Sequence, residues 1–526
     1  MIRTAALNGA THDAERKILD DIEHQFQLGQ DALIKITEQF LEDFRLGLGD
    51  YNHPMAMIPT FVTGVPDGTE TGTFLALDLG GTNLRVCEVT LLGNHDFRLR
   101  QQKYKVSEAL KTGEATVLFD YLADSVDAFL TEFSSATGSP VSTSVANPFD
   151  SPTEVPLGLT FSFPVEQTAL NEGKILTWTK GFAAKNAIGN DVVRLLQDAF
   201  DRKHLHVRCV ALVNDTVGTL LSRAYTAGSC LLGGIFGTGT NGAFVEQVSN
   251  ITKLGNSPAR TKGGVMIVNT EWGAFNNTRT TLPTTPYDNK LDRESINPRK
   301  QAFEKFISGM YLGEITRNIL LSLIDASPRP LLFDGSSSAP LNTHYGLDTA
   351  IISEVEYAWE SGRGDEVAPQ KSSGSKPNWQ SAHFTDVDAL SPQDIARLER
   401  IRDILIQRLQ LAPENVTLRD AAIVRWAASL VANRAARLSA TAIAAVLVQT
   451  SHAKLGGGTP EPKENIVVGV DGSLIQHYPN FQTRLRASLQ SLVGEAVEKR
   501  VEIDLAKDGS GAGAALCALQ AIKQGL

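Results

Sequence analysis

The sequence predicts an α/β fold with a duplicated core and a cleft between its two halves. Apolar runs rich in β-branched residues alternate with helical segments along the 526-residue chain, as is typical of α/β proteins. Two hairpins of the form strand, glycine turn, strand resemble each other, which indicates a duplication. Hydrophobic residues make up 42% and charged residues 21% of the chain, so it can bury a large core and is not expected to be disordered.

Two segments have the pattern of helices that pack on a core. In residues 31–48 the side chains of Ile36, Phe40 and Phe44 share one helical face, and glycines mark the end of the segment. Residues 418–449 are rich in alanine, which we interpret as close helix packing without a role in chemistry. The apolar runs predicted as strands are residues 74–79, 84–90, 157–163, 207–213, 231–236, 266–268 and 466–470.

Two polar segments, residues 134–156 and 360–376, are predicted to be surface insertions. The first is rich in Ser, Thr, Pro and Gly, and the second contains Ser-Gly-Arg-Gly-Asp and Ser-Ser-Gly-Ser. Such compositions favour plain loops, and a regulatory phosphorylation site is the alternative.

The composition also limits the class of protein. The formal net charge of −10 argues against a nucleic-acid-binding surface. The N-terminus lacks an apolar signal core, and the uncharged run at residues 438–453 is shorter than the roughly 18 apolar residues of a membrane span. We therefore expect a cytoplasmic protein with no membrane insertion and no nucleic-acid partner. Four widely spaced cysteines without a CxxC pair favour a reducing compartment over a zinc site or disulfide framework: Cys87, Cys209, Cys230 and Cys517.

The first hairpin, residues 77–86, has the features of a phosphate-binding turn. Glycines let the backbone approach a ligand closely, and successive N–H groups in such a turn form an anion nest. Arg85 offers a fork to phosphate oxygens, and Asp78 at the strand end is placed to hold Mg²⁺ through water. An ordinary hairpin is the alternative. The candidate phosphate-binding residues are Asp78, Gly80, Gly81, Thr82, Asn83 and Arg85.

The second hairpin, residues 234–244, repeats this pattern. Its candidate residues are Gly237, Thr238 and Gly239. The glycines also match GxGxxG, but a dinucleotide-binding fingerprint must open a helix, and here the chain continues as a strand.

Asp215 is the candidate general base. It follows a buried strand and begins a helix, and ligand sites of α/β proteins lie at the carboxyl ends of strands. A hydroxyl that accepts a phosphoryl group needs a carboxylate to receive its proton. The structural alternative is a helix cap.

Two Asp-Gly-Ser turns lie near the C-terminus, at residues 471–473 and 508–510. The structural alternative for each is an ordinary turn or a helix cap. The second turn opens a glycine-rich helix, which is suited to binding phosphate or adenosine.

Together these residues resemble the eukaryotic hexokinase and glucokinase family, of the fungal single-unit type, within the superfamily of sugar kinases, Hsp70 and actin. The resemblance extends from about residue 36 to residue 519, and several motifs are long, unusual and in the family's order. The motifs are residues 157–164 (LGLTFSFP), 178–182 (WTKGF), 213–219 (VNDTVGT), 236–241 (FGTGTN), 269–275 (NTEWGAF), 303–305 (FEK) and 508–513 (DGSGAG).

The resemblance implies a two-lobed, actin-like ATPase fold of the ribonuclease H type, with a duplicated mixed five-stranded sheet and a cleft between a small and a large lobe. Residues 1–77 would hold the N-terminal helices and the start of the large lobe, and residues 78–214 the small lobe. Residues 215–508 would form the large lobe, and residues 509–526 a C-terminal helix that returns to the small lobe.

The resemblance also implies a reaction, the ATP-dependent phosphorylation of a hexose at its 6-hydroxyl. Asp215 would be the base, and Lys180 and Arg85 would complete the catalytic set. Carboxylates, amides and hydroxyls suit the hydroxyls of a hexose, because loss of one partner leaves a buried polar group unpaired. The sugar-binding positions carried over are Ser162, Phe163, Pro164, Thr179, Lys180, Asn214, Asp215, Asn241, Glu271 and Glu304.

The implied cofactors are ATP and Mg²⁺, with Asp78 as the metal-binding residue through water. Besides the two glycine turns, the positions expected near the nucleotide are Thr349, Ser353, Gly509 and Ser510. Structural alternatives apply to two sugar positions, since Glu304 with Lys305 also suits an exposed helix, and Glu271 beside Trp272 also suits a structural role.

One loop departs from the family pattern. Residues 297–301 read Asn-Pro-Arg-Lys-Gln, so that Arg299 stands where the family usually has glycine. Because the loop precedes Glu304, we expect sugar affinity or domain closure to differ. The polar insertions are also unusual for the family, and their role is open.

Glucose is the expected substrate, with fructose and mannose as further candidates, and the reaction would be the first step of glycolysis. One alternative is a catalytically weak sugar sensor or regulator on the same fold, and another is a chaperone-like or filament-forming ATPase of the superfamily. The intact motifs argue against the first, and the sugar positions against the second. The oligomeric state is left open between a monomer and a homodimer.

Overall fold

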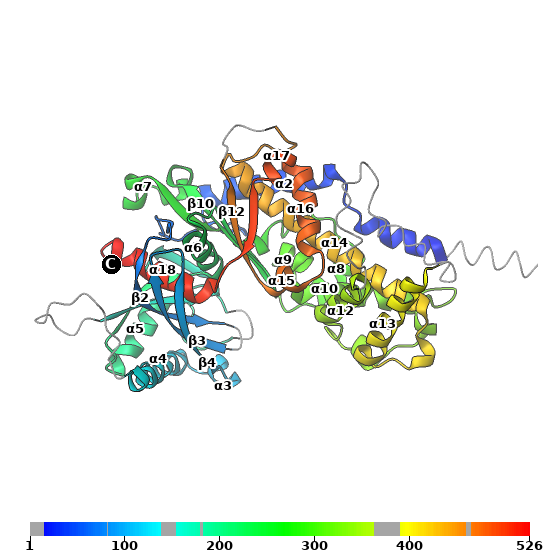
Figure 1. Ribbon diagram of the computed structural model, residues 1–526, viewed down its shortest axis with the longest axis horizontal. Helices are drawn as coiled ribbons and strands as arrows, with labels where there is room; N and C mark the ends of the chain where they lie inside the picture. Colours follow the sequence, from blue (N-terminus) through cyan, green and yellow to red (C-terminus); the bar gives the residue numbers. More distant parts are fainter. Residues whose placement is uncertain (1–14, 81–82, 138–153, 179–181, 362–389, 459–463) are drawn as a thin grey trace, which may run out of the picture.

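Two mixed β-sheets form the centre of the molecule (Figure 1). The computed structural model describes residues 15–80, 83–137, 154–178, 182–361, 390–458 and 464–526. The strands are β1 (Ile58–Pro59), β2 (Thr71–Leu79), β3 (Asn83–Leu92), β4 (Phe97–Lys105), β5 (Val155–Phe161), β6 (Val165–Ala169), β7 (Glu172–Ile175), β8 (Val207–Val213), β9 (Leu232–Phe236), β10 (Thr240–Gln247), β11 (Val265–Asn269), β12 (Ile466–Asp471) and β13 (Val501–Leu505). The α-helices are α2 (Gln30–Gly49), α3 (Glu108–Thr112), α4 (Ala115–Thr137), α5 (Val192–Arg202), α6 (Asp215–Ala227), α7 (Pro258–Lys262), α8 (Pro286–Glu294), α9 (Ala302–Ile307), α10 (Gly309–Ile324), α11 (Ala339–Asn342), α12 (Thr349–Glu360), α13 (Pro392–Leu409), α14 (Leu418–Gln449), α15 (Ser473–His477), α16 (Phe481–Val493), α17 (Glu495–Glu498) and α18 (Gly509–Lys523).

The two sheets share one strand order. The five-stranded sheet has the order β4-β3-β2-β5-β8, and the six-stranded sheet has the order β1-β11-β10-β9-β12-β13. In each sheet three consecutive strands form an antiparallel meander, and two later strands pair parallel to its first strand and to each other. The short strand β1 only adds an edge to the second sheet. The predicted duplication of a mixed five-stranded core is therefore confirmed.

Each predicted strand is present, with ends shifted by up to three residues. Strand β5 ends at Phe161, and not at Phe163, because the chain turns at Ser162 before Pro164. Sequence analysis missed the edge strands β4 and β13, in which exposed charged residues alternate with buried ones. Such strands lack the continuous apolar run of a strand that is buried on both faces.

Strand β2 shows why the central strands were easy to predict. Leu75, Leu77 and Leu79 belong to a core cluster shared with α4 and α5 on one face of the sheet. Phe74 and Ala76 belong to a second cluster, shared with α6 and α18 on the other face. Since both faces are covered, nearly every side chain in the second half of the strand is apolar.

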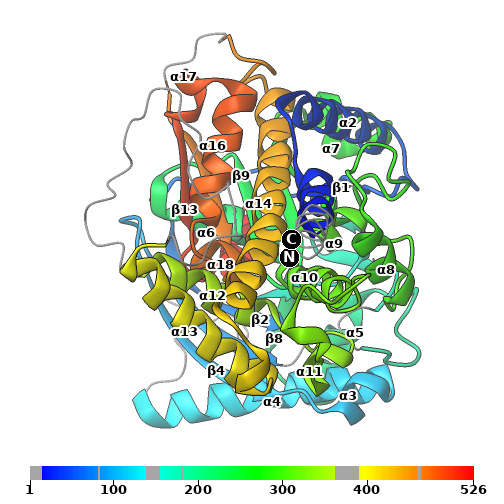
Figure 2. The ribbon, with the colours of Figure 1, turned by 90° about the vertical axis from the view of Figure 1, so that its right-hand side faces the viewer.

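We call the five-stranded sheet with α4 and α5 the small lobe, and the six-stranded sheet with α2 and the helices from α8 to α17 the large lobe. In Figure 1 the small lobe lies at the lower left, and α8, α10, α12 and α13 lie at the right. Figure 2 shows α14 running lengthwise through the large lobe between α16 and α2, both of which it contacts. Strand β2 begins at Thr71, ahead of the small-lobe boundary at residue 78 that the resemblance implies.

Helix α14 is the core of the large lobe. The prediction of a helix at residues 418–449 is confirmed, and its alanines are buried against neighbouring helices. This helix is long and apolar enough to cross a membrane, but 83% of its most apolar window is buried inside the molecule. Its apolar character is therefore explained by helix packing within the fold.

The predicted surface insertions fall largely outside the described residues. The first is shorter than predicted at both ends, because α4 continues to Thr137 and β5 begins at Val155. Helix α12 ends at Glu360, where the second was expected to begin.

All four cysteines are free thiols, and all four are buried. Burial raises the pKa of each thiol to about 12, so the thiols stay protonated at neutral pH.

Helices α6 and α18 lie together between the two sheets, and both contribute to the core cluster there (Figure 1). Their backbones approach so closely at Gly218 and Gly513 that a Cβ atom on Gly513 would lie 2.1 Å from the Gly218 Cα. Only glycine fits at such a crossing. The contact fixes the first residues of both helices side by side, and these residues include Asp215 and Gly509.

We predict that Gly513→Ala lowers the stability of the protein. The added methyl group meets backbone atoms, which cannot move aside without separating the helices, and overpacking of this kind costs about 1–3 kcal/mol. Thermal unfolding followed by calorimetry measures the loss.

Gly49→Ala is the matched control, because this glycine ends α2 and the nearest atom to an added Cβ, Thr252 Oγ1, lies at 3.9 Å. Its melting temperature should be unchanged or slightly raised. Equal melting temperatures for Gly513→Ala and the wild type would contradict the proposed crossing.

Candidate active site

A cavity opens where the two lobes meet. One wall comes from the β5–β6 turn and the end of β8 in the small lobe, and the other from β1 and β11 in the large lobe. The lining includes Phe163 and Asn214, which were predicted to bind sugar, and Asn269, which was not assigned a role. The remaining lining residues are Ile58, Thr60, Phe161, Val165, Gln167, Leu212 and Val213.

The start of α6 places Asp215 directly after Asn214, which lines this cavity. Asn214 is the N-cap, and its Oδ1 accepts hydrogen bonds from the Thr216 N–H at 3.0 Å and from the Thr216 hydroxyl at 2.6 Å. The capping role considered for Asp215 thus belongs to Asn214. Among the described residues, no side chain or backbone N–H donates a hydrogen bond to the Asp215 carboxylate. The carboxylate is therefore available for a ligand.

A network of amides and one carboxylate lies beside Asn214. Asn241 Nδ2 donates to Asn269 Oδ1 at 2.9 Å and to Glu271 Oε1 at 3.2 Å. Asn269 Nδ2 donates to the same Glu271 oxygen at 2.8 Å. Asn241 Nδ2 also lies 3.5 Å from Asn214 Oδ1, which connects the network to the start of α6. Two predicted sugar-binding residues, Asn241 and Glu271, are thus brought together with Asn214.

The backbone at Glu271 is in the left-handed region, with φ 55° and ψ 42°. This conformation is rare for a residue other than glycine and occurs often at functional sites. The next residue, Trp272, is fully buried, and its Nε1–H donates to Thr240 Oγ1 at 3.0 Å. Trp272 therefore has the structural role in this segment, because it packs in the core. Glu271 does not, because its side chain accepts hydrogen bonds from the amide network.

Glu304 connects the sugar-binding positions to the second glycine turn. Its Oε2 accepts a hydrogen bond from the Thr240 N–H at 3.0 Å. The same turn is held from α10, since the Gly309 N–H donates to Gly237 O at 2.7 Å and the Met310 N–H to Thr238 O at 3.2 Å. Strand β10 follows the turn, which confirms that the GxGxxG match does not open a helix.

A buried ion-pair cluster supports the loop before Glu304. Lys305 is only 2% exposed, and its Nζ lies 2.7 Å from Asp292 Oδ1, which also lies 2.7 Å from Arg279 Nη2. Burial opposes ionisation of Asp292, but the hydrogen bonds from Lys305 and from the Arg299 N–H outweigh it, and the pKa of Asp292 is lowered. The alternative of an exposed Glu304–Lys305 surface is therefore wrong.

Arg299 completes this loop under strain. Its φ is 62°, in the region that favours glycine, and its N–H donates to both Asp292 oxygens at 3.1 Å. The backbone thus keeps a glycine-type conformation although arginine occupies the position, and the side chain is exposed.

The strand residues that flank the first glycine turn contact the start of α18. Arg85 Nη2 lies 2.8 Å from Asp78 Oδ2 and 3.2 Å from Asp508 Oδ1. Burial raises the pKa of Asp78, against the lowering effect of Arg85, and the charges of Asp215 and Asp508 raise it further. Burial likewise raises the pKa of Asp471, with added contributions from Asp215 and Asp508. The four carboxylates therefore form one acidic region around a single guanidinium group.

Asp471 and Asp508 are functional candidates that were not assigned a role. The Asp-Gly-Ser turns pointed to both, but an isolated turn of this type is usually structural. Asp508 does cap α18, because its side chain accepts a hydrogen bond from the Gly511 N–H at 3.0 Å. Asp508 also contacts Arg85, and a local sequence pattern could not reveal this contact because Arg85 is distant in sequence.

The other predicted residues are more peripheral or lie outside the described residues. Thr349 Oγ1 accepts a hydrogen bond from the Gly313 N–H at 2.9 Å, so this hydroxyl joins α12 to α10. Ser353 lies one turn later on α12, and Gly509 and Ser510 begin α18. Gly80 and Asn83 flank the first turn and are joined by a backbone hydrogen bond of 3.0 Å. The predicted residues outside the described part of the chain are Gly81, Thr82, Thr179 and Lys180.

An aromatic cluster surrounds the predicted sugar residues of the small lobe. Ser162, Phe163 and Pro164 form the turn between β5 and β6. Phe163 packs against Trp178 and Phe182, with ring centroids 5.0 Å away in both cases. Trp178 and Phe182, which precede and follow residues 179–181 in the sequence, also stack on each other with ring centroids 5.5 Å apart.

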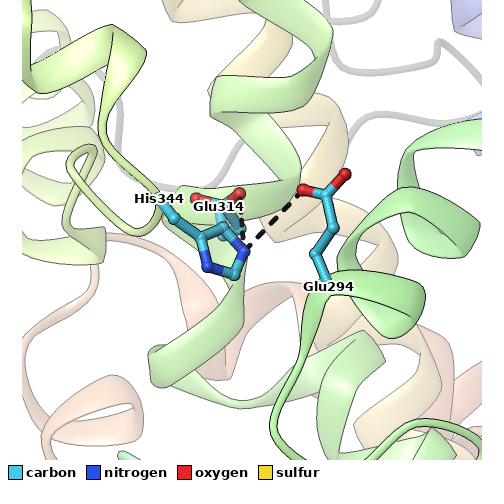
Figure 3. A group of neighbouring side chains, drawn as sticks. All are labelled: Glu294, Glu314 and His344. Carbon is cyan, nitrogen blue, oxygen red and sulfur yellow. Dashed lines mark ion pairs between the residues drawn. The ribbon is translucent and has the colours of Figure 1, made fainter.

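One further group of side chains has metal-ligand spacing among the described residues, but it lies outside this cavity (Figure 3). His344 Nε2 lies 3.5 Å from Glu314 Oε1 and 4.0 Å from Glu294 Oε2. Both oxygens of the buried Glu314 carboxylate already accept hydrogen bonds from Arg317, at 2.8 and 2.5 Å. Because this guanidinium neutralises Glu314, we assign the group to an ion-pair cluster.

The duplicated sheets and the cavity between the lobes define an actin-like sugar kinase fold. Hexokinase family profiles match residues 18–225 and 231–520. The chain is 38% identical to a glucokinase of Aspergillus niger over 96% of both chains. It is 35% identical to glucokinase-1 of Saccharomyces cerevisiae over 98% of this chain and 99% of the relative. The solved structure of the Schistosoma mansoni hexokinase complexed with glucose is similar, with a TM-score of 0.75 and 33% identity over 96% of this chain and 99% of that one.

The chain belongs to the hexokinase family. The resemblance noted in the sequence motifs is confirmed along the whole chain, including its relation to fungal single-unit members.

We predict that Arg299→Gly raises the stability of the protein. Glycine adopts the positive φ without steric cost, and the relief of about 1–2 kcal/mol exceeds the loss of chain entropy. Thermal unfolding should show a higher melting temperature.

Lys300→Gly is the control, because this neighbouring exposed residue has no positive φ. Glycine there should lower the melting temperature by adding only flexibility to the unfolded chain. If both substitutions lower it equally, Arg299 carries no backbone strain.

Proposed function

We propose that the protein transfers the γ-phosphoryl group of ATP to the 6-hydroxyl of a hexose, preferably glucose, and gives hexose 6-phosphate and ADP. This would be the first step of glycolysis. The observation that carries the proposal is the position of Asp215, whose carboxylate lies between the amide network and the acidic phosphate side without a hydrogen bond from described residues. The names of the glucokinase relatives, and the glucose in the Schistosoma mansoni complex, support the choice of sugar.

The sugar would be held by groups from both lobes. Asn214, Asn241 and Glu271 form one connected set, and Glu304 adds a carboxylate from α9. Ser162, Thr179 and Lys180 would complete the set from the small lobe. A ring of amides and carboxylates discriminates between sugars, because a missing or inverted hydroxyl leaves a buried polar group without its partner.

Asp215 would accept the proton of the sugar 6-hydroxyl during transfer. Asp215 lies in the first turn of α6, directly after Asn214, which lines the cavity. A base held by the backbone of a helix needs no rearrangement to reach its substrate.

The nucleotide phosphates would lie across the two glycine turns, with Arg85 as a donor to their oxygens and Lys180 near the transferred group. Arg85 is held between Asp78 and Asp508, so its orientation is set before the nucleotide binds.

The carboxylates of Asp78, Asp471, Asp508 and Asp215 share one buried region with a single arginine, and this excess of negative charge suits a divalent cation. Asp78 would hold Mg²⁺ through water. Bound with ATP, Mg²⁺ would neutralise phosphate charge during transfer.

Closure of the two lobes over the sugar would exclude water, which otherwise accepts the phosphoryl group. The proposal includes a cytoplasmic location, a monomer or homodimer, and the lobe boundaries near residues 78, 215 and 509. The proposal includes neither binding to nucleic acid nor insertion into a membrane.

The first test is ADP release from Mg²⁺-ATP with and without glucose, for the wild type and for Asp215→Asn. Release should depend on glucose and should fall by about 10²–10⁴-fold in the variant, which keeps the shape of the side chain but cannot accept the proton. Glucose binding, measured by calorimetry, should remain.

Asp198→Asn on the exposed face of α5 is the matched control and should keep wild-type turnover. Glucose binding without turnover in the wild type would favour the sugar-sensor alternative. ATP turnover that does not respond to glucose would contradict sugar phosphorylation.

A further inference from the structure

We propose that Asn269 is a positioning residue for the sugar site, whose side-chain amide holds Asn241 and Glu271 in the orientation that binds the sugar. This inference rests on the proposed function, since it takes these two residues as sugar ligands. Asn269 begins the motif at residues 269–275, but it was assigned no role from the sequence.

The geometry gives Asn269 contacts with both residues. Its Oδ1 accepts a hydrogen bond from Asn241 Nδ2 at 2.9 Å, and its Nδ2 donates to Glu271 Oε1 at 2.8 Å. One side chain therefore uses its acceptor for one ligand and its donor for the other. A carboxylate, which only accepts, or an ammonium group, which only donates, cannot perform both tasks at neutral pH.

Asn269 itself is rigidly placed. It is the last residue of β11 and pairs with Ala243 of β10 on one side and with Ile58 of β1 on the other. The residue is 5% exposed and lines the cavity between the lobes. Its amide is thus fixed by the sheet, whereas the residues that it contacts come from a strand start and a turn.

Asn241 and Glu271 need such support for different reasons. The Oδ1 of Asn241 accepts a hydrogen bond from the Gly242 N–H at 2.8 Å, and its Nδ2 lies on the side of Asn214. Glu271 has a left-handed backbone, which a hydrogen bond to its side chain helps to stabilise. The Glu271 N–H also lies 3.4 Å from Asn269 Oδ1, so the amide contacts both the backbone and the side chain of this turn.

The test is Asn269→Asp, which preserves shape but replaces the donor with a carboxylate that faces Glu271. Among the described residues, the carboxylates nearest this amide network are Glu271, Asp215 beyond Asn214, and Glu304 at the Thr240 N–H. At about pH 8 the repulsion should raise the KM for glucose by about 10- to 100-fold, while the KM for ATP changes little.

The pH profile separates positioning from a general effect on the fold. At about pH 5.5 the two carboxylates share a proton, which restores a donor between them, so the ratio of variant to wild-type KM for glucose should fall. The ratio cancels the effects of pH that the variant and the wild type have in common.

Asn250→Asp is the matched control. Asn250 Nδ2 donates to Glu246 Oε1 at 2.9 Å, which is the same type of pair at the far end of β10. This variant should keep the wild-type KM for glucose at every pH.

Asn269→Ser provides a second variant of smaller size, which should also raise the KM for glucose but without the recovery at low pH. The inference is overturned if Asn269→Asp leaves the KM for glucose unchanged, if it raises both KM values at a constant ratio across pH, or if both Asn269 variants fail to fold. Glucose-independent turnover in the wild type would instead overturn the proposed function.

Discussion

The close crossing of α6 and α18 is the contact on which the site depends. Gly218 and Gly513 allow the two helices to touch along their backbones, and the helices together fill the space between the sheets. The start of α6 carries Asp215, and the start of α18 carries the glycine-rich turn and its cap, Asp508. A wider crossing would separate the candidate base from the acidic region that includes Asp78, so helix packing and chemistry have the same geometric requirement.

Two further sets of contacts join the sugar positions to the rest of the molecule. Asn269 connects Asn241 and Glu271 at the end of β11, whereas Glu304 connects α9 to the second glycine turn. The Asp292 cluster holds the loop before Glu304 and tolerates Arg299 in a strained backbone. Substitutions in this loop therefore affect stability and ligand binding through a shared set of buried charges.

The sequence was sufficient to predict the fold class, the duplicated hairpins and the central strands, because strands such as β2 and β8 are buried on both faces and leave continuous apolar runs. Edge strands such as β4 were missed, since solvent on one side allows polar residues there. The helix start at Asp215 was placed correctly, but its cap, Asn214, was recognised only from the structure.

The same limit applies to the site. Asn241 and Glu271 were assigned from sequence, whereas Asn269, Asp292 and Asp508 were not, although Asn269 and Asp508 begin recognised motifs. Asp292 and Asp508 act through contacts with segments distant along the chain, and no local pattern records such contacts. The role of Lys305 was also hidden, because a lysine beside a glutamate on a helix usually faces solvent, whereas here it is buried against Asp292.

Helix α18 has a consequence for how the protein is made. It contacts β2, β5 and β8, which leave the ribosome hundreds of residues earlier. Until α18 has been synthesised, the face of the small-lobe sheet that packs against α6 and α18 is incompletely covered and is exposed to aggregation or to chaperones. The small lobe therefore completes its folding only late in synthesis, and a premature stop codon ahead of α18 damages the first-made sheet as much as the end of the chain.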